Sequence, residues 1–342
     1  MIISEIRKDD LRAIRQQKQL LEESGLRLDQ HLDYSCGLFD DDYNLMATGS
    51  CYHNTLRDIA IKPEYRSEAL LNTLMSHLID VQYSRGNRKI FLYTKPDTAS
   101  SFGYLGFYEI VRSDKIAFME NSSDGFERYL DNLCSGCELR ESAAIVMHGN
   151  PYTLGHRYLI EKALENHDQL HLFMVSEDYS PIPYSIRKKL IIEGCSDLEG
   201  IVYHDCSDYI ISSATFPAYF QKSEEDVILS QADIDTSVFV KIAKRMNITE
   251  RYIGTEKRSK VTSLYNETIR NKLTSAGIKV TEVDRLSISG KEISASEVRR
   301  LLVEREWNAL KNLVPQTTLE FFQSEEGNQI IERIAQSEIE HY

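Results

Sequence analysis

Residues 1–125 alternate apolar and polar positions in a way that predicts an α+β domain. Residues 34–61 hold three runs of period-two alternation separated by short turns, a pattern typical of an antiparallel meander. Residues 64–83 place apolar side chains three and four positions apart, as an amphipathic helix does. Three further elements are expected: a strand over 89–94, a short helix near Ser100 and a strand from Phe107.

The hydrophobic pattern changes after residues 126–140. These residues are a polar stretch with one short helix, which we expect to be the linker between two domains. From residue 141 to residue 342, short apolar runs alternate with helical stretches and C-terminal helices. This alternation predicts an α/β domain with a Rossmann-like, doubly wound parallel sheet, which binds ligands beyond the carboxyl ends of its strands. The expected strands are Ala143–Met147, Leu170–Val175, Ile201–His204, Arg251–Gly254 and Ile278–Val283.

Charge and composition narrow the possible functions. The 342 residues carry a net charge of −13, which argues against general attraction to nucleic acid or to an anionic membrane, so a phosphate ligand needs a local site. The charged start is unlike a secretory signal, and no apolar run approaches a membrane span. The six scattered cysteines do not form a disulfide framework. We expect a cytoplasmic protein with free thiols.

The first candidate motif lies where the strand over 143–147 enters a helix. Gly149-Asn150-Pro151 is followed by Thr153-Leu-Gly155-His156 and then by the apolar spacing of a helix. The amides of a helix N-terminus attract phosphate, Gly155 allows close approach, and His156 could donate a charge-assisted bond. A simple helix cap with a surface histidine accounts for the same residues equally well.

The second candidate motif is Ile293-Ser294-Ala-Ser296-Glu297-Val-Arg299. Ser294 or Ser296 could cap a helix, and Glu297 stands in the capping-box relation to Ser294. Arg299 would lie one turn inside the helix, where its guanidinium fork could reach a phosphate at the same N-terminus. Taken alone, a capped helix with a solvated arginine explains this segment as well.

Together, the two motifs resemble the (H/T)xGH and ISxSxxR signatures of the nucleotidylyltransferase superfamily. The wider sequence is similar to the citrate lyase ligase family within it. The similar segments are residues 150–160, 171–178, 209–220, 254–256 and 261–266.

The resemblance implies an acid-thiol ligase that uses ATP in two steps. Acetate attacks the α-phosphorus to give acetyl adenylate and pyrophosphate, and a thiol on the citrate lyase acyl carrier subunit then takes the acetyl group. His156 would stabilise charge on the phosphates, Thr153 would donate to a phosphate oxygen, and Arg299 with Ser294 and Ser296 would hold the β and γ phosphates. Asn150 and Gly155 would complete the ATP site. A Mg²⁺ ion bridging the phosphates is expected, and no protein metal site is predicted.

Four weaker candidates lie near these motifs or in the linker. Arg187 falls where related enzymes carry a basic residue, and Gly254, in Gly254-Thr255-Glu256, ends a strand at the ligand edge. We expect His148 to be packed against a neighbour. Cys134-x-x-Cys137 is a single pair with no histidine close by in the sequence, which argues against zinc and redox roles.

The first domain resembles the Gcn5-related N-acetyltransferase fold. In that fold a loop before the long helix cradles the pyrophosphate of acyl-CoA with small residues. The corresponding residues here, 66–71, are Arg-Ser-Glu-Ala-Leu-Leu, and they replace both small positions and add Glu68. We therefore expect a recognition or structural module, with the CoA-like arm of the carrier as a candidate ligand, and not an acetyltransferase.

Two other functions fit the signatures less well. One is a nucleotidylyltransferase that joins AMP to a phosphorylated vitamin precursor, which the long similarity beyond the two signatures disfavours. The other is a non-catalytic nucleotide-binding scaffold, which has no physical need for all of the signature residues.

Overall fold

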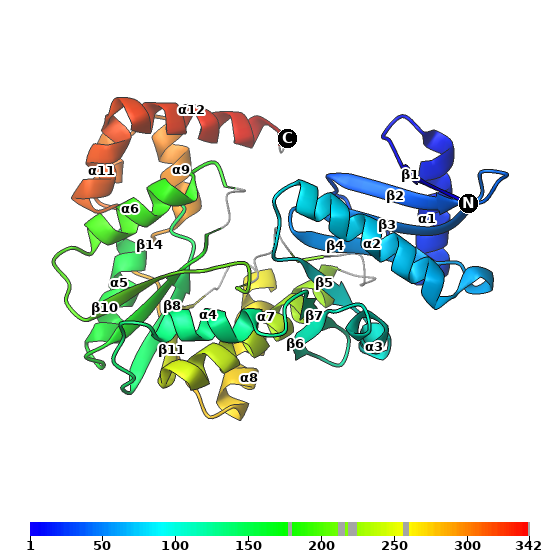
Figure 1. Ribbon diagram of the computed structural model, residues 1–342. Coiled ribbons are helices and arrows are strands. Elements are labelled where there is room, and N and C mark those ends of the chain that lie inside the picture. Colours follow the sequence, from blue (N-terminus) through cyan, green and yellow to red (C-terminus); the bar gives the residue numbers. More distant parts are fainter. Residues whose placement is uncertain (177–179, 211–215, 218–223, 256–259, 341–342) are drawn as a thin grey trace. The chain divides into compact units, whose positions relative to one another are not determined.

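The computed structural model describes residues 1–176, 180–210, 216–217, 224–255 and 260–340. The chain divides into two compact units (Figure 1). The first comprises Met1–Tyr129 and Thr215–Val238, and the second comprises Leu130–Ala214 and Phe239–Tyr342. The sequence pattern did not indicate that residues 215–238 group with the first unit.

The first unit contains a seven-stranded mixed sheet. Its strand order is β1-β2-β3-β4-β5-β7-β6, and every described pair is antiparallel except β4 with β5. The predicted meander is confirmed as β2, β3 and β4. The strands are β1 Ile2–Glu5, β2 Tyr34–Phe39, β3 Leu45–Tyr52, β4 Thr55–Ile61, β5 Phe91–Thr94, β6 Tyr108–Arg112 and β7 Ala117–Glu120.

The helices of the first unit pack their apolar positions into its core. The helix predicted over 64–83 is α2, Glu68–Ser84, which buries Leu74, Met75 and Leu78. It begins later than predicted because Pro63–Tyr65 forms a separate 3₁₀ turn and Ser67 is the N-cap. The other elements are α1 Leu11–Glu23, α3 Ala99–Gly103, a second 3₁₀ turn at Pro96–Thr98 and α4 Gly125–Cys134, which continues into the second unit.

The second unit contains the predicted parallel sheet, in the order β10-β9-β8-β11-β12. All its pairs are parallel, and the chain proceeds outward from β8 first to one side and then to the other. The crevice of such a sheet lies at the carboxyl ends of the strands where the order reverses, here β8 and β11. The strands are β8 Ser142–Met147, β9 Leu170–Met174, β10 Ile201–Asp205, β11 Ile248–Gly254 and β12 Lys279–Val283.

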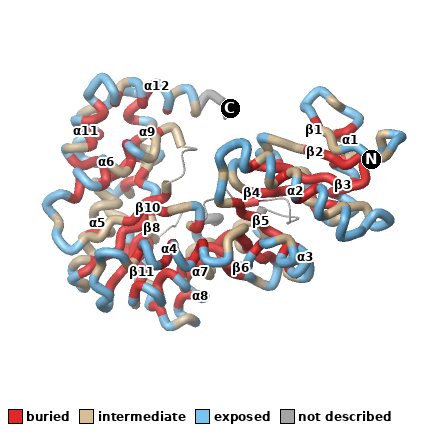
Figure 2. The backbone as a smooth tube through the Cα atoms, viewed as in Figure 1, coloured by how far each residue is buried: buried red, intermediate tan, exposed pale blue. Residues whose placement is uncertain are grey.

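Helices and one small hairpin complete the second unit. The central strands are largely buried, whereas the outer helix surfaces are exposed (Figure 2). None of the described helices is long and apolar enough to cross a membrane. The elements are α5 Leu154–Leu164, α6 Tyr184–Gly194, α7 Glu224–Met246, α8 Lys260–Ser275, β13 Ser287–Ile288, β14 Lys291–Glu292, α9 Ala295–Val303, α10 Trp307–Leu310, α11 Gln316–Gln323 and α12 Glu325–Glu340.

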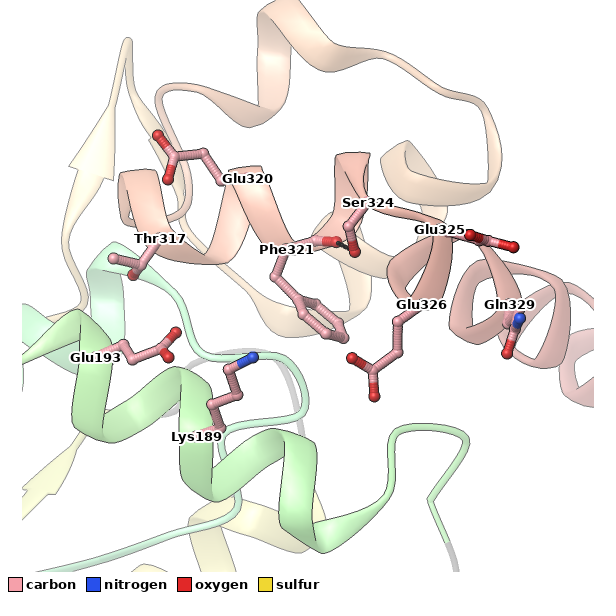
Figure 3. A pocket seen from close by; sticks show the side chains of 9 residues that line it. All are labelled: Lys189, Glu193, Thr317, Glu320, Phe321, Ser324, Glu325, Glu326 and Gln329. Atoms are coloured by element: carbon pink, nitrogen blue, oxygen red, sulfur yellow. Dashed lines mark hydrogen bonds between the residues drawn. The ribbon is translucent and has the colours of Figure 1, made fainter.

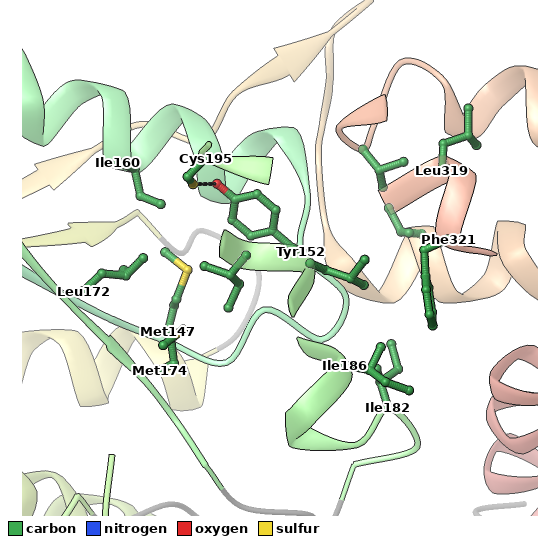
Figure 4. Close-up of a cluster of buried hydrophobic side chains, with 14 of the residues drawn as sticks. Met147, Tyr152, Ile160, Leu172, Met174, Ile182, Ile186, Cys195, Leu319 and Phe321 are labelled. Carbon is green, nitrogen blue, oxygen red and sulfur yellow. Dashed lines mark hydrogen bonds between the residues drawn. The ribbon is translucent and has the colours of Figure 1, made fainter. Parts of the chain in front are cut away.

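Tyr152 anchors the first motif in the core of this unit. Its ring is fully buried among apolar side chains, and its hydroxyl lies 2.8 Å from Sγ of Cys195 (Figure 4). Because Tyr152 precedes Thr153 directly, this packing fixes the position at which α5 begins.

Candidate active site

The loop between β8 and α5 places Thr153 and His156 at the carboxyl end of the central strand. Thr153 is the N-cap of α5, and its hydroxyl oxygen accepts from the backbone N–H of His156 at 3.3 Å. The backbone N–H of Thr153 donates in return to Nδ1 of His156 at 3.1 Å. These two bonds form a capping box in which a histidine takes the usual place of glutamate.

The same bonds fix the protonation of His156. Nδ1 accepts from the Thr153 amide and lies 2.9 Å from the Thr153 hydroxyl, so the proton of the neutral ring belongs on Nε2. Burial and then the positive charge of Arg285 lower the pKa of His156 to about 4. The chain's own groups therefore keep this imidazole neutral, and the charge-assisted bond expected from the sequence is replaced by a neutral Nε2–H donor.

The second motif meets the first at the loop that precedes α5. Nη1 of Arg299 donates to the backbone carbonyl of Asn150 at 2.7 Å, and Nη2 donates to the hydroxyl of Ser296 at 3.2 Å. A Cβ added at Gly155 would lie 3.6 Å from Cβ of Ile293. The N-termini of α5 and α9 are therefore adjacent, and two such termini attract an anion.

Ser294 is the N-cap of α9 and accepts from the backbone N–H of Glu297 at 3.2 Å. The predicted capping box is incomplete because the carboxylate of Glu297 pairs with Lys291 and Arg300. Ser296 is exposed and Ser294 is partly buried. A hydroxyl that accepts a bond still has its own hydrogen to donate, so Ser294 keeps a donor for a ligand.

Arg187 binds the backbone of the strand ends. It is buried, and its guanidinium donates to the carbonyl oxygens of His148 at 2.9 Å, Val175 at 2.8 Å and Ile182 at 3.1 Å. Arg187 therefore fixes the segments that follow β8 and β9. His148 is exposed as a whole residue, yet its imidazole lies close enough to Arg187 and His156 to interact electrostatically with both, and its packing against a neighbour stays a prediction.

Gly254 ends β11, the neighbour of β8, and its carbonyl accepts from Nδ2 of Asn266 at 3.2 Å. A Cβ at this position would meet no atom within 4 Å. Thr255 pairs with the next strand through its N–H, which donates to the Val283 carbonyl at 2.9 Å. Glu256 and residues 177–178, 211–215 and 218–220 of the family-like segments lie outside the described residues.

Arg285 is a site residue that the sequence reasoning missed. It follows β12, and its Nε donates to the carbonyl of Thr255 at 3.0 Å. Its charge acts on the imidazole of His156, which places a second cation near the α5 N-terminus. The available signal was a basic residue two positions after the end of the last parallel strand, at the sheet edge where ligands bind.

Two pockets lie away from this constellation. One, of about 640 Å³, is lined by residues of α6, α11 and α12 (Figure 3). It contains one lysine and four glutamates, a charge balance that repels a nucleotide: Lys189, Glu193, Glu320, Glu325 and Glu326. The other, of about 780 Å³, lies in the first unit and is lined in part by Arg66, Ser67, Glu68 and Lys95.

Relatives of known name were found by sequence comparison. Residues 142–322 match the family model of the citrate lyase ligase C-terminal domain. The [citrate [pro-3S]-lyase] ligase of Haemophilus influenzae is 37% identical over 318 residues, covering 89% of this chain and 93% of the relative. The Klebsiella pneumoniae protein of that name is 39% identical over 284 residues, covering 81% and 83%, and the Escherichia coli K12 protein is 33% identical over 338 residues, covering 94% of each.

Solved structures match more distantly. Thermotoga maritima TmcAL bound with α-thio ATP matches with 14% identity and a TM-score of 0.38, over 54% of this chain and 55% of that one. An Enterococcus faecium aminoglycoside 6′-N-acetyltransferase matches with 15% identity and a TM-score of 0.30, over 35% and 96%. The family itself rests on the sequence matches: with a matched model over residues 142–322 and three relatives at least 33% identical over four-fifths or more of both chains, this chain belongs to the citrate lyase ligase family.

Proposed function

We propose that this chain activates acetate with ATP and transfers the acetyl group to the prosthetic thiol of the citrate lyase acyl carrier subunit, which activates the lyase. The observation that carries the proposal is the meeting of the two helix N-termini at the loop before α5. There, a neutral Nε2–H donor on His156 and the guanidinium of Arg299 face one anion-binding region. Family membership supplies the identity of the acceptor.

In the first step, a carboxylate oxygen of acetate forms a bond to the α-phosphorus of ATP, and the bond from that phosphorus to the bridging oxygen breaks. Pyrophosphate leaves with the electron pair, so negative charge grows on the α-phosphate oxygens and on the leaving group. Nε2–H of His156 and the first amides of α5 are the donors for this charge, and both are positioned before the reaction.

Thr153 positions His156. Its hydroxyl makes two contacts with His156, to the backbone N–H at 3.3 Å and to Nδ1 at 2.9 Å. Because these contacts engage Nδ1, Nε2–H is the ring group left to act on the reacting phosphate. This positioning role adds to the donation to a phosphate oxygen that family resemblance implies.

Arg299 would hold the β and γ phosphates with help from Ser294 and Ser296. The bonds from its guanidinium to Asn150 and Ser296 fix the orientation of the fork at the start of α9. Arg285 adds a second positive charge that acts on His156, and its Nε donates to the Thr255 carbonyl.

Mg²⁺ would neutralise part of the phosphate charge. The described site residues are mainly hydroxyls, amides and cations, and Oδ1 of Asn150 is a buried oxygen acceptor with no partner among the described atoms. This donor set fits an ion held mostly by phosphate oxygens and water, with Asn150 as the one protein oxygen within the constellation suited to it.

In the second step, the carrier thiol forms a bond to the acetyl carbon, and the bond from that carbon to the phosphate oxygen breaks. The thiol proton goes to solvent and AMP leaves. The test is incubation of the chain with ATP, labelled acetate and purified acyl carrier. The proposal is supported if label appears on the carrier and an excess of thiol reagent prevents this labelling. It is contradicted if the carrier stays unlabelled while all components are active.

The alternative vitamin-precursor reaction is not favoured, because each named relative is similar to this chain over at least 81% of the chain's length.

For the first unit we propose a recognition role. The N-terminus of α2 opens on the 780 Å³ cavity beside Lys95, which suits the phosphate-bearing arm of a carrier. None of the six cysteines, all of them described, forms a disulfide, which suits the reducing cytoplasm we propose for the enzyme.

A further inference from the structure

One cysteine and two histidines that the proposed reaction does not use meet inside the second unit. His171 on β9 and His204 on β10 are 0% and 7% exposed. Nδ1 of His171 lies 2.9 Å from Nε2 of His204. The sulfur of Cys137 and one nitrogen of each ring all lie within 4.8 Å of one another. Three side chains from three segments therefore present metal-ligand atoms to one point.

The strand register explains how the two histidines come together. His171 pairs with Val202, two residues before His204 on the neighbouring strand. Since strand residues two apart share a face, both rings lie on the same face of the sheet. The sequence separation of 33 residues hides this proximity from motif inspection.

Cys137 is supplied by a tight turn after α4. The N–H of Cys137 donates to the carbonyl of Cys134 at 3.2 Å, and Gly136 has a φ of +80°. This Cys-Ser-Gly-Cys turn needs glycine at its third position, where the backbone is left-handed. Cys134 begins this turn, and its thiol donates to the carbonyl of Arg245 at 3.7 Å.

Packing alone does not account for this arrangement. Two buried imidazoles share a single hydrogen bond, and Nε2 of His171 has no partner among the described atoms. Burying an unpaired polar nitrogen costs about 1–3 kcal/mol, a cost that valine or isoleucine on the same strand face would avoid. The pair is therefore better explained by a ligand that uses its lone pairs.

We propose that Cys137, His171 and His204 bind a zinc ion, with Cys134 or water as the fourth ligand. A thiolate and two imidazoles are donors that Zn²⁺ prefers, and bonds of about 2.0–2.3 Å to a shared ion require only small adjustments of these side chains. Binding releases the proton of the Cys137 thiol, and the proton between the two rings moves to the other nitrogen of its own ring, so both histidines bind as neutral imidazoles. The ion fastens the segment after α4 to β9 and β10, away from the proposed ATP site.

The first test measures metal in the purified full-length chain and then titrates the chelated protein with Co²⁺. The expected result is one zinc per chain, and a cobalt complex with tetrahedral visible bands and a thiolate-to-cobalt charge-transfer band. Cys137→Ala loses both, whereas Cys51→Ala, a buried cysteine of the first unit, keeps them. An absent charge-transfer band in the unsubstituted protein, or a band that survives Cys137→Ala, overturns the proposal.

A second measurement avoids any substitution in the core. Alkylation of the native chain, read by mass spectrometry, should modify Cys137 in the chelated protein and leave it protected after zinc is added. Equal modification in both samples overturns the proposal even if Cys137→Ala fails to fold. Cys134→Ala identifies the fourth ligand. At least a tenfold loss of cobalt affinity assigns Cys134, and unchanged affinity with intact bands assigns water. In both cases the other three ligands are Cys137, His171 and His204.

Discussion

Arg299 and Asn150 are 149 residues apart in the sequence, yet Nη1 of Arg299 donates to the Asn150 carbonyl at 2.7 Å. This bond joins the second signature to the loop that begins the first. Because it fixes a guanidinium beside the loop that precedes α5, we propose that the two capped helices form a single anion-binding site. Each motif alone is compatible with a structural role, and their contact is what favours a nucleotide site.

Gly155→Ala should retain the fold and lose ATP binding. An added Cβ would make ordinary contacts, 3.5 Å to Oγ1 of Thr153 and 3.6 Å to Cβ of Ile293, and alanine favours a helix by about 0.5–1 kcal/mol. The methyl group would nevertheless lie between the two helix N-termini, where phosphate is expected. Calorimetric titration with ATP and urea unfolding measure the two effects separately.

Gly149→Ala is the matched control, because it should lower the stability of the fold and not act on ATP binding directly. Gly149 has a φ of +59°, and a Cβ there would lie 2.8 Å from Cδ1 of Ile191. We expect a loss of about 1–2 kcal/mol of stability from the left-handed backbone. Undiminished ATP affinity in Gly155→Ala would contradict the proposed position of the phosphates.

Arg299→Lys should slow adenylate formation roughly 10- to 150-fold, since losing a hydrogen bond to a charged group costs about 1.5–3 kcal/mol. Lysine keeps the charge but cannot hold Asn150, Ser296 and a phosphate with one planar fork. Arg300→Lys is the control, because Arg300 is exposed and pairs with Glu297 and Glu304. Equal rates for the two variants would remove Arg299 from the site.

Thr153→Val should lower both stability and rate, whereas Thr153→Ser should preserve both. Valine removes the hydroxyl that caps α5, at a cost of about 0.5–2 kcal/mol in the free energy of unfolding. It also removes one of the two donors that keep Nδ1 of His156 unprotonated. Urea unfolding with a parallel exchange assay provides the check, and a serine variant as defective as valine would refute the positioning role.

Acid should destabilise the chain in part through His156. Its pKa in the folded state, about 4, lies below the ordinary 6.5, so the unfolded state binds a proton first and stability is lost as pH falls from 6.5 toward 4. Between pH 7 and pH 5 this amounts to about 2 kcal/mol. Urea unfolding of the unsubstituted chain and of His156→Gln at both pH values measures it. An identical pH dependence in the two proteins would contradict the assignment.

The sequence was sufficient for the meander, the parallel strands and the two motifs, but it did not indicate β1, α1, β7 as a separate strand or the β13–β14 hairpin. Period-two alternation located the meander, because a strand buried on one face alternates apolar and polar residues. Short apolar runs located the parallel strands, because a strand buried on both faces is apolar throughout. The start of α2 was misplaced because Pro63 forms a 3₁₀ turn before the true cap at Ser67.

The contacts between distant segments could not be predicted in this way. Nothing near Cys137 in the sequence indicates His171 and His204, whose proximity depends on strand register. The neutral state of His156 likewise depends on Arg285 and on burial, which only the folded chain brings to it. Local patterns therefore identified candidate residues, while charge states and partners required the tertiary structure.

The central claim is the formation of acetyl adenylate at His156, and exchange of labelled pyrophosphate into ATP tests it without the carrier subunit. With Mg²⁺ and purified protein, we expect exchange that requires acetate. It should fall about 10²- to 10³-fold in His156→Ala, the usual effect of losing one preorganised donor, and less in His156→Gln, whose amide can replace Nε2–H. Acetate-independent exchange, or full exchange in His156→Ala with the fold intact, would contradict the account.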